Sequence, residues 1–307
     1  MANGRETVFT VAELQRIFNG VGGYYDMPNT ALADAIIKWN FLDENNLVNT
    51  RNIDSFMKWS FTASLLQLVN AFQWFFAGVI LTASAPLTAQ ALQMYYYSIF
   101  FSMGAFLSAQ FKGHYTLSET YDKQGTPHGK RNEVWVNKSE KPMRIQTQEQ
   151  GSAGEHKIRA NWFYEVFNGW ELKDLHGGVK LFQSNQQYHS GYRNMFTYSL
   201  RNMGEELFSM PDHAKGKIPN DILIQLWNLD DDIAEYYPEQ SWALEHIKVP
   251  LFLHLKLLEG YEDDSPYYSS QINLFRQLYN HHKTTDLSFF LEGTVGPILE
   301  HMDIMPA

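Results

Sequence analysis

The densest group of polar and aromatic side chains in the 307-residue sequence lies between residues 189 and 202. On a helix His189 and Arg193 share one stripe, because residues four positions apart lie on the same face. A guanidinium group holds a phosphate and stabilises developing charge, while an imidazole moves a proton near neutral pH. The pattern predicts a phosphodiester site, with Asn194 and Tyr198 beside these two groups.

The same segment has a structural interpretation. Arg193 would then form an ion pair with an acidic residue of a neighbouring helix, and Tyr192, Phe196 and Tyr198 would pack in the core. Removal of one partner of a buried ion pair costs about 3–5 kcal/mol. A phosphate-binding arginine contributes little to stability, so the two alternatives predict opposite effects of Arg193→Ala.

A second arginine and histidine occur five positions apart, in the segment Arg276-Gln-Leu-Tyr-Asn-His281. On a helix Arg276 and Asn280 share a face, and His281 lies about 100° around the helix from Asn280. This pair supplies the same two chemical groups. The alternative is an exposed helix end, where cationic side chains favour the last carbonyl groups.

Other chemistry finds little support in the sequence. Acid and histidine pairs that could bind a metal lack the spacing of known zinc motifs; they are Glu245-His246 with His254, and Glu300-His301. There is no glycine-rich phosphate loop and no nucleophile elbow. The absence of cysteine excludes disulfides, thiolate metal sites and a cysteine nucleophile. We therefore expect neither a cofactor nor a metal.

The elements that must position these residues are mainly helices. From Trp59 to Phe111 the sequence has neither a charged residue nor a histidine. A membrane hairpin needs two apolar spans of about 20 residues each. The candidate spans, Leu65–Leu87 and Leu92–Phe111, are interrupted by glutamine, asparagine and serine. We expect instead two buried helices of a soluble bundle that turn at Ser84-Ala85-Pro86, with the proline in a first helical turn.

The first part of the chain and the middle differ in pattern. Val11, Leu14, Ile17 and Phe18 recur at helical spacing, and Asn29-Thr30 is a candidate cap for a further helix. Between about 113 and 160, Val-Trp-Val and Met-Arg-Ile-Gln-Thr alternate as strands do, around the turn Lys-Ser-Glu-Lys-Pro. His156–Phe163 is either a third strand or the start of the next helix.

These patterns define the fold class and the organisation that we expect. The protein is mainly α, a multi-helix bundle with a small β-hairpin or three-stranded insertion. Its segments are an N-terminal helical part at 1–58, a helical core at 59–210 that holds the insertion at about 113–160, and a C-terminal helical part at 211–307.

Composition limits the classes of partner and compartment. Hydrophobic residues make up 44% and charged residues 19%, which allows a packed core and excludes general disorder. The net charge of −10 argues against a protein that coats nucleic acid with its whole surface, although a local basic face can still bind it. The lack of cysteine fits a reducing compartment, and we expect a soluble, cytoplasmic protein with no membrane partner.

The segment Arg193-Asn194-Met-Phe-Thr-Tyr198, together with the apolar, tyrosine-rich stretch from Met94 to Ala109, resembles the HEPN superfamily of small helical domains. Members often carry an arginine, a polar residue, a few variable residues and a histidine. Tyr198 stands where that histidine is expected. The resemblance covers about residues 60–210 and implies a helical, RNA-directed protein of a toxin–antitoxin or phage-defence system, whose active members are metal-independent ribonucleases. It also implies a site built across a homodimer.

Three functions follow as hypotheses. The first is a HEPN-like RNA-directed protein of a bacterial or phage conflict system that binds RNA, with ribonuclease activity as an open question and an antitoxin as a protein partner. Its site residues would be His189, Arg193, Asn194, Tyr198, Arg276 and His281. The second is a non-catalytic helical scaffold whose aromatic and acidic surfaces bind a protein. The third is a membrane-associated protein, suggested by the charge-free stretch.

Overall fold

The computed structural model is mainly helical with a small antiparallel sheet, which confirms the predicted fold class. It describes residues 8–25, 53–82, 88–116, 120–121, 127–128, 131–149, 155–171, 218–228, 231–259, 261 and 276–281, and positions 290, 292 and 296. The predicted cap at Asn29-Thr30 and the predicted turn at Ser84-Ala85-Pro86 lie outside these residues.

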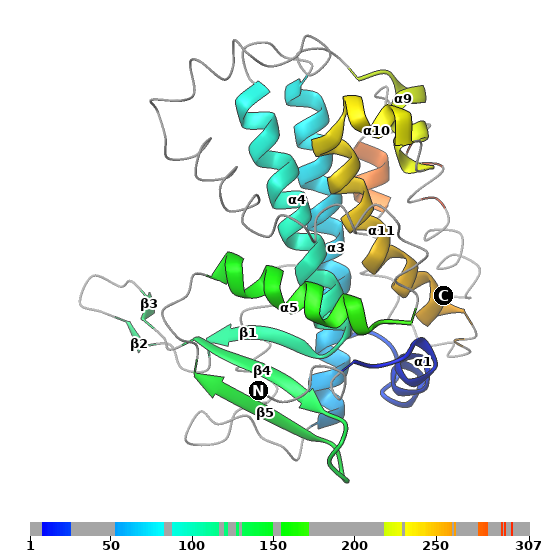
Figure 1. The fold of residues 1–307 in the computed structure, drawn as a ribbon. Coiled ribbons are helices and arrows are strands. Elements are labelled where there is room, and N and C mark those ends of the chain that lie inside the picture. The colour runs from blue at the N-terminus through cyan, green and yellow to red at the C-terminus, as the bar shows by residue number, and fades with distance from the viewer. Residues whose placement is uncertain are drawn as a thin grey trace.

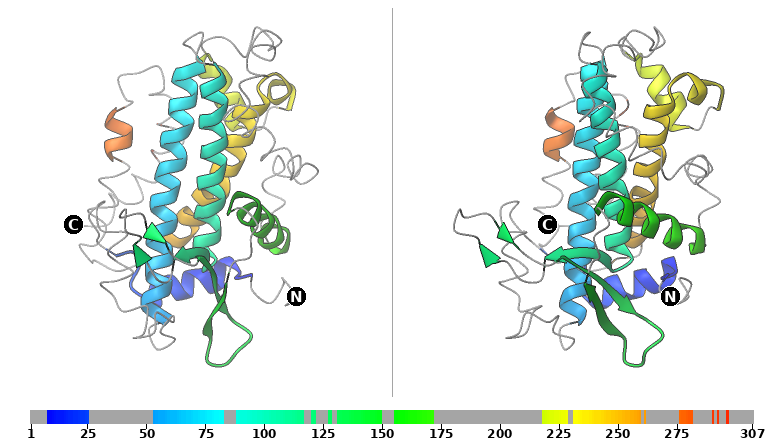
Figure 2. Two further views of the ribbon diagram at one scale, coloured as in Figure 1. Left: turned by 90° about the vertical axis from the view of Figure 1, so that its left-hand side faces the viewer. Right: turned by 60° about the vertical axis from the view of Figure 1, so that its left-hand side comes forward.

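Three long helices form the centre of the molecule (Figure 1). They are α3 (Ile53–Thr82), α4 (Thr88–Ala109) and α11 (Pro238–Leu258). The first two pack along their lengths, and α11 packs against both. Around them lie α1 (Val11–Gly20), α5 (Glu155–Gly169), α9 (Asn220–Trp227), α10 (Asp231–Tyr236) and a short helix at 276–281. Figure 2 shows the central bundle from two further sides.

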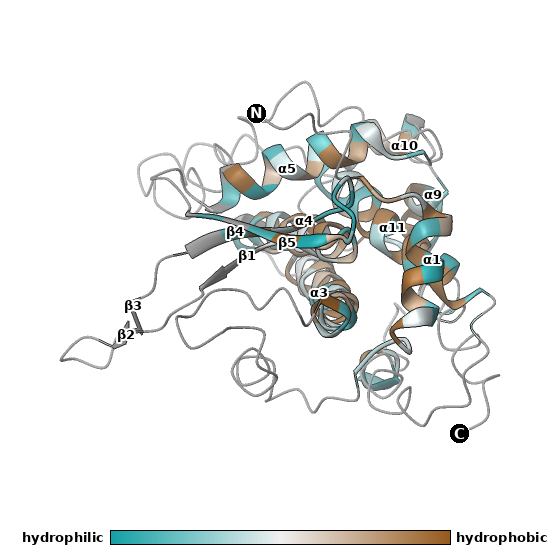
Figure 3. Cartoon of the chain, turned by 90° about the horizontal axis from the view of Figure 1, so that it is seen from below, coloured by the Kyte–Doolittle hydropathy of each residue, from teal (hydrophilic) through white to brown (hydrophobic). Residues whose placement is uncertain are grey.

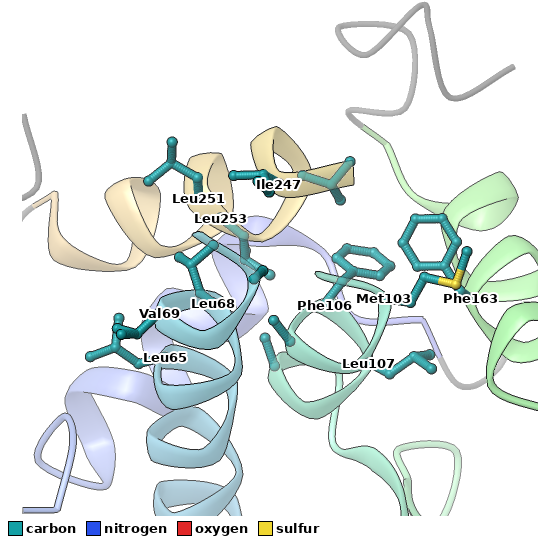
Figure 4. Close-up of a cluster of buried hydrophobic side chains, with 14 of the residues drawn as sticks. Leu65, Leu68, Val69, Met103, Phe106, Leu107, Phe163, Ile247, Leu251 and Leu253 are labelled. Carbon is teal, nitrogen blue, oxygen red and sulfur yellow. The ribbon is translucent and has the colours of Figure 1, made fainter. Parts of the chain in front are cut away.

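The charge-free stretch forms the predicted pair of helices, α3 and α4. In α3, buried residues occur on every side of the helix, because its neighbours pack around it. Figure 4 shows the apolar layer that results, with Leu65, Leu68 and Val69 of α3 near Phe106 of α4 and Leu253 of α11. Among the described helices, α3 alone is long and apolar enough to cross a membrane, and 56% of its most apolar window is buried. Core helices of soluble proteins pass the same test.

The serines that interrupt α4 are bonded inside the helix pair. Ser98 Oγ donates to the carbonyl oxygen of Ala71 on α3 at 2.9 Å, and Ser102 Oγ donates to that of Ser98 at 2.8 Å. Ser108 Oγ accepts from the Gln67 amide at 2.9 Å. Buried hydroxyl groups need such partners, since an unmet one costs about 1–3 kcal/mol. Ser98 and Ser108 therefore help to hold α4 against α3, while Ser102 is bonded within α4.

The β insertion contains a three-stranded antiparallel sheet in the order β1-β4-β5. Its strands are β1 (Lys112–Thr116), β4 (Arg131–Asn137) and β5 (Arg144–Glu149). The predicted hairpin is confirmed, with Val136 opposite Ile145 on either side of the turn. A separate two-stranded pair joins β2 (Thr120–Tyr121) to β3 (Pro127–His128). Seen from below, β5 is largely hydrophilic (Figure 3).

Of the two alternatives for His156–Phe163, a third strand or the start of a helix, the helix is confirmed. His156–Phe163 belongs to helix α5, and the third strand is β1, which directly follows α4. The chain turns into β1 at Phe111, whose φ of 57° is left-handed. This conformation costs roughly 1–2 kcal/mol for a residue with a side chain. Burial of the Phe111 ring against Phe9 and Phe61, with centroids about 5 Å apart, offsets that cost.

Helix α1 begins with a capping box that fixes its start. Thr10 Oγ1 accepts from the Glu13 backbone N–H at 3.2 Å, and the Glu13 carboxylate accepts from the Thr10 N–H at 2.8 Å. Leu14, Ile17 and Phe18 are buried, as their helical spacing predicts. The capping box and this apolar face place α1 below α11, where the end of the β4–β5 hairpin meets it.

Candidate functional site

The predicted site residues fall into two groups. His189, Arg193, Asn194 and Tyr198 lie outside the described residues, so the structure does not bear on that cluster. Arg276 and His281 are described, and both lie in the helix at 276–281. This helix is on the outer side of the bundle, next to α3 in both views of Figure 2, where it is orange.

The packing of this short helix exposes its polar residues. Leu278 is buried in the core at 4% exposure, and Tyr279 packs against the core. Arg276 and His281 are exposed. Five residues correspond to about 140° of rotation along an α-helix, so these two side chains leave the helix in different directions. A single phosphate would contact both only with help from a second element or a second copy of the chain.

The most complete polar network in the described structure surrounds His254 on α11. Tyr24 Oη lies 2.6 Å from His254 Nδ1, and Ser64 Oγ of α3 lies 2.7 Å from Nε2. Ser64 Oγ also donates to the carbonyl oxygen of Ala105 on α4 at 2.6 Å. All three side chains are at most 1% exposed. Sequence reasoning noted His254 as a weak metal-ligand candidate and missed its two partners.

The direction of these bonds decides what the network can do. Ser64 has one hydroxyl proton, and Ala105 accepts it, so Ser64 Oγ accepts from His254 Nε2–H. His254 Nδ1 then accepts the proton of Tyr24. A serine nucleophile needs the reverse arrangement, in which the imidazole accepts its proton, and it needs access for a substrate. We conclude that this network links α3, α4 and α11 within the packed core.

His246, two turns before His254 on α11, is also buried and bonded. Its Nδ1 lies 2.7 Å from the Trp242 carbonyl oxygen, and Tyr164 Oη of α5 lies 3.5 Å from Nε2. Burial lowers the pKa of His246 to about 4, although the bond to the carbonyl opposes this shift. Burial lowers the pKa of His254 to about 3. Both histidines are therefore neutral at physiological pH.

A half-exposed arginine and histidine lie three positions apart where α5 crosses α4. His156 Nδ1 lies 2.6 Å from Tyr96 Oη, and the His156 ring lies 4.2 Å from that of Phe100. The Arg159 guanidinium lies 3.8 Å from the Phe100 ring centre, within cation–π distance. The spacing of His156 and Arg159 can be read from the sequence and would place both on one face of a helix. Sequence reasoning missed this pair because the segment was interpreted as either a strand or the start of a helix.

A buried lysine begins β1. Lys112 is 6% exposed, and its Nζ lies 5.4 Å from the Trp162 ring centre on α5. Burial lowers its pKa, and the charges of Glu165 and Glu133 oppose that shift. Burial raises the pKa of Glu133, which the charge of Lys112 opposes. The charges of these two carboxylates thus favour the ammonium form of Lys112.

The described residues contain no group of three His, Asp or Glu side chains that could hold a metal ion. Comparison of the chain with protein-family models, with curated proteins and with solved structures gives no match.

Proposed function

We propose that this protein is an RNA-directed, HEPN-like helical protein of a bacterial or phage conflict system, and that it cleaves RNA without a metal ion. The observation that supports this proposal is the exposure of Arg276 and His281 on one short helix, at the spacing of an arginine followed five positions later by a histidine. The buried Leu278 anchors that helix, so both groups are presented to solvent from a fixed support.

In the proposed RNA cleavage, Arg276 and His281 have separate roles. Arg276 binds the phosphate and stabilises the charge that develops on its oxygens. His281 removes the proton of the neighbouring 2′-hydroxyl, whose oxygen attacks phosphorus while the 5′-oxygen leaves and takes up a proton. The products are a 2′,3′-cyclic phosphate and a 5′-hydroxyl end. The outward directions of Arg276 and His281 favour a homodimer, in which each phosphate is contacted by two copies.

The test is an incubation of the purified full chain with total RNA in the presence of EDTA, followed by analysis of the RNA ends. We expect 2′,3′-cyclic phosphate ends from the wild type and a loss of at least 100-fold in rate for His281→Ala, since general acid–base catalysis contributes about 10²–10⁴-fold. Arg276→Ala is expected to lose both cleavage and RNA binding.

The matched control is Gln277→Ala, at an exposed position of the same helix. It should keep the wild-type rate, and the melting temperature of all three variants is measured alongside so that loss of activity is separated from loss of the fold. Wild-type RNA that stays intact, or a His281→Ala variant with the wild-type rate, would exclude this site. Arg193→Ala, tested in parallel, assigns the activity to the other cluster if it alone abolishes cleavage.

A non-catalytic binding or scaffold protein is the second candidate. It is favoured by a group of half-exposed rings on the outer surface of α3 and α4, where the Trp74 ring centre lies 5.0 Å from that of Tyr97 and 6.4 Å from that of Phe101. Aromatic residues are enriched in protein interfaces. A protein that leaves RNA intact and co-purifies with one partner in a fixed ratio would support this function, with an antitoxin as one such partner.

A further inference from the structure

A pocket of about 450 Å³ lies between helix α1 and the turn of the β4–β5 hairpin. It is within the range of small-molecule sites, about 300–1,000 Å³. Helix α1 supplies one wall and the hairpin turn, residues 138–143, supplies the other. The two walls are tied by the ion pair between Lys138 Nζ and Glu13 Oε2 at 2.8 Å.

Apolar side chains from both walls line this pocket. Phe9 and Ile17 come from the α1 side, and Pro142 and Met143 come from the hairpin. Phe9 and Ile17 also belong to the main core, and Met143 packs against it. The apolar lining is thus backed by the packed interior, which makes it a stable surface for an apolar group.

The acidic residues of the pocket are already paired within the chain. Glu13 accepts from Lys138 and from the Thr10 backbone N–H. Burial acts to raise the pKa of Glu13, but these bonds outweigh it and the pKa lies below its ordinary value. Glu140 accepts from the amides of Asn137 and Gln146, and it also pairs with Arg144.

Two further cationic side chains line the pocket. Arg16 and Lys141 line it from opposite walls, and both are exposed. Within the part of the chain that the structure describes, neither has a carboxylate partner. The rim is therefore positive over an apolar lining, in a protein whose net charge is −10.

We propose that this pocket binds a small carboxylate that carries an apolar chain or ring. The apolar part packs against Ile17, Pro142 and Met143, while Arg16 and Lys141 contact the carboxylate. An uncharged molecule of the same shape loses the contacts to the rim, and a cation meets repulsion there. The site lies apart from Arg276 and His281 and does not depend on the proposed ribonuclease activity.

The test uses octanoate and 1-octanol as probes of the full-length protein. Because the chain has no cysteine, Ser139→Cys on the pocket wall accepts a single environment-sensitive dye, whose emission reports entry into this pocket. We expect octanoate to shift the emission at lower concentration than 1-octanol. Adding Arg16→Gln and Lys141→Gln should weaken octanoate binding about tenfold, a few-fold for each exposed charge, and leave 1-octanol binding unchanged.

The control is Lys256→Gln, which removes a charge outside the pocket whose partner is Glu259. It should leave octanoate binding within twofold of that of the labelled parent. The proposal is overturned if octanoate does not change the emission, if 1-octanol binds equally well, or if Lys256→Gln weakens binding as much as Arg16→Gln or Lys141→Gln does alone. Melting temperatures within a degree of each other exclude unfolding as the cause.

Discussion

At the residue scale, His254 shows how a titratable side chain can serve the fold. Tyr24 donates to its Nδ1, and its Nε2–H donates to Ser64, so both ring nitrogens are satisfied while the ring is neutral. Protonation of Nδ1 would replace an acceptor with a donor that faces the Tyr24 hydroxyl. Burial strengthens this preference, because a charged ring loses its hydration. The fold thus favours the neutral form of His254.

We predict that stability falls when the pH is lowered from 7 to 5. The pKa values of His246 and His254 are about 4 and 3 in the fold and about 6.5 in the unfolded chain. The unfolded chain therefore binds more protons below pH 6.5, and folded stability decreases as the pH falls toward the folded pKa values. Each histidine contributes a loss of about 2 kcal/mol at pH 5. Urea unfolding monitored by tryptophan fluorescence measures it.

Replacement of one histidine separates this effect from general acid sensitivity. His254→Gln lowers stability at pH 7, but it should remove about half of the decrease between pH 7 and pH 5. Ser102→Ala is the control, since it removes a buried hydroxyl bond and no histidine. It should keep the wild-type decrease. An unchanged pH dependence in His254→Gln would show that His254 is not neutral in the fold.

At the element scale, the contact of α3 with α4 depends on the absence of a side chain at Gly78. A Cβ atom at this position would lie 2.6 Å from Cε1 and 2.8 Å from Cδ1 of Tyr95. The Tyr95 ring is 1% exposed, and its hydroxyl lies 2.9 Å from Thr82 Oγ1, so it has little freedom to move. The glycine in mid-helix therefore lets the two helices approach each other.

We predict that Gly78→Ala destabilises the protein by about 1–3 kcal/mol, the usual cost of overpacking. Helix propensity alone predicts the opposite sign, a gain of about 1 kcal/mol for alanine. Gly20→Ala at the end of α1 is the matched control, because a Cβ there has no neighbour within 4 Å. It should be neutral or stabilising. Thermal melts of both variants decide the point, and a stabilised Gly78→Ala would contradict the packing argument.

The elements that were predictable from the sequence have a local pattern. Alternation around a proline-containing turn predicts the β4–β5 hairpin, and helical spacing predicts α1. Strand β1 has no such pattern: Lys112 to Thr116 is polar, and its conformation comes from pairing with β4. In the segment His156–Phe163, the burial of Ala160 and Phe163 three positions apart fits a helix and excludes strand alternation.

The candidate sites were less predictable, because their residues are far apart in the chain. The partners of His254, Tyr24 and Ser64, are separated from it by 230 and 190 positions, and only packing brings them together. The pocket at α1 likewise joins Arg16 to Lys141 across the β insertion. Arg276 and His281 were accessible to sequence reasoning since both lie within one short helix.

At the scale of the whole molecule, one continuous core joins α1, the central helices, the sheet and α5. Phe290, far along the chain, packs against Phe75 and Phe76 of α3, with ring centres about 6 Å away, and against Trp227 of α9. Much of the apolar surface of α3 is thus covered by other parts of the same chain. If α3 lay in lipid, acyl chains would contact that surface instead of other parts of the protein.

This coverage leads to the last prediction, that the full chain is soluble and monodisperse without detergent. Ile80 of α3 is 48% exposed, so it tests the two environments directly. In a soluble protein Ile80→Glu changes stability by less than about 0.5 kcal/mol, as surface substitutions do. In a bilayer an acidic residue costs up to roughly 3 kcal/mol at the centre of a span and less toward the end, where Ile80 would lie, and it would disturb insertion. Size-exclusion chromatography of both proteins without detergent, with membrane fractionation of the expressing cells, measures the outcome. Recovery of the wild type only from the membrane fraction would establish that α3 lies in lipid, and the proposed cytoplasmic location would then be wrong.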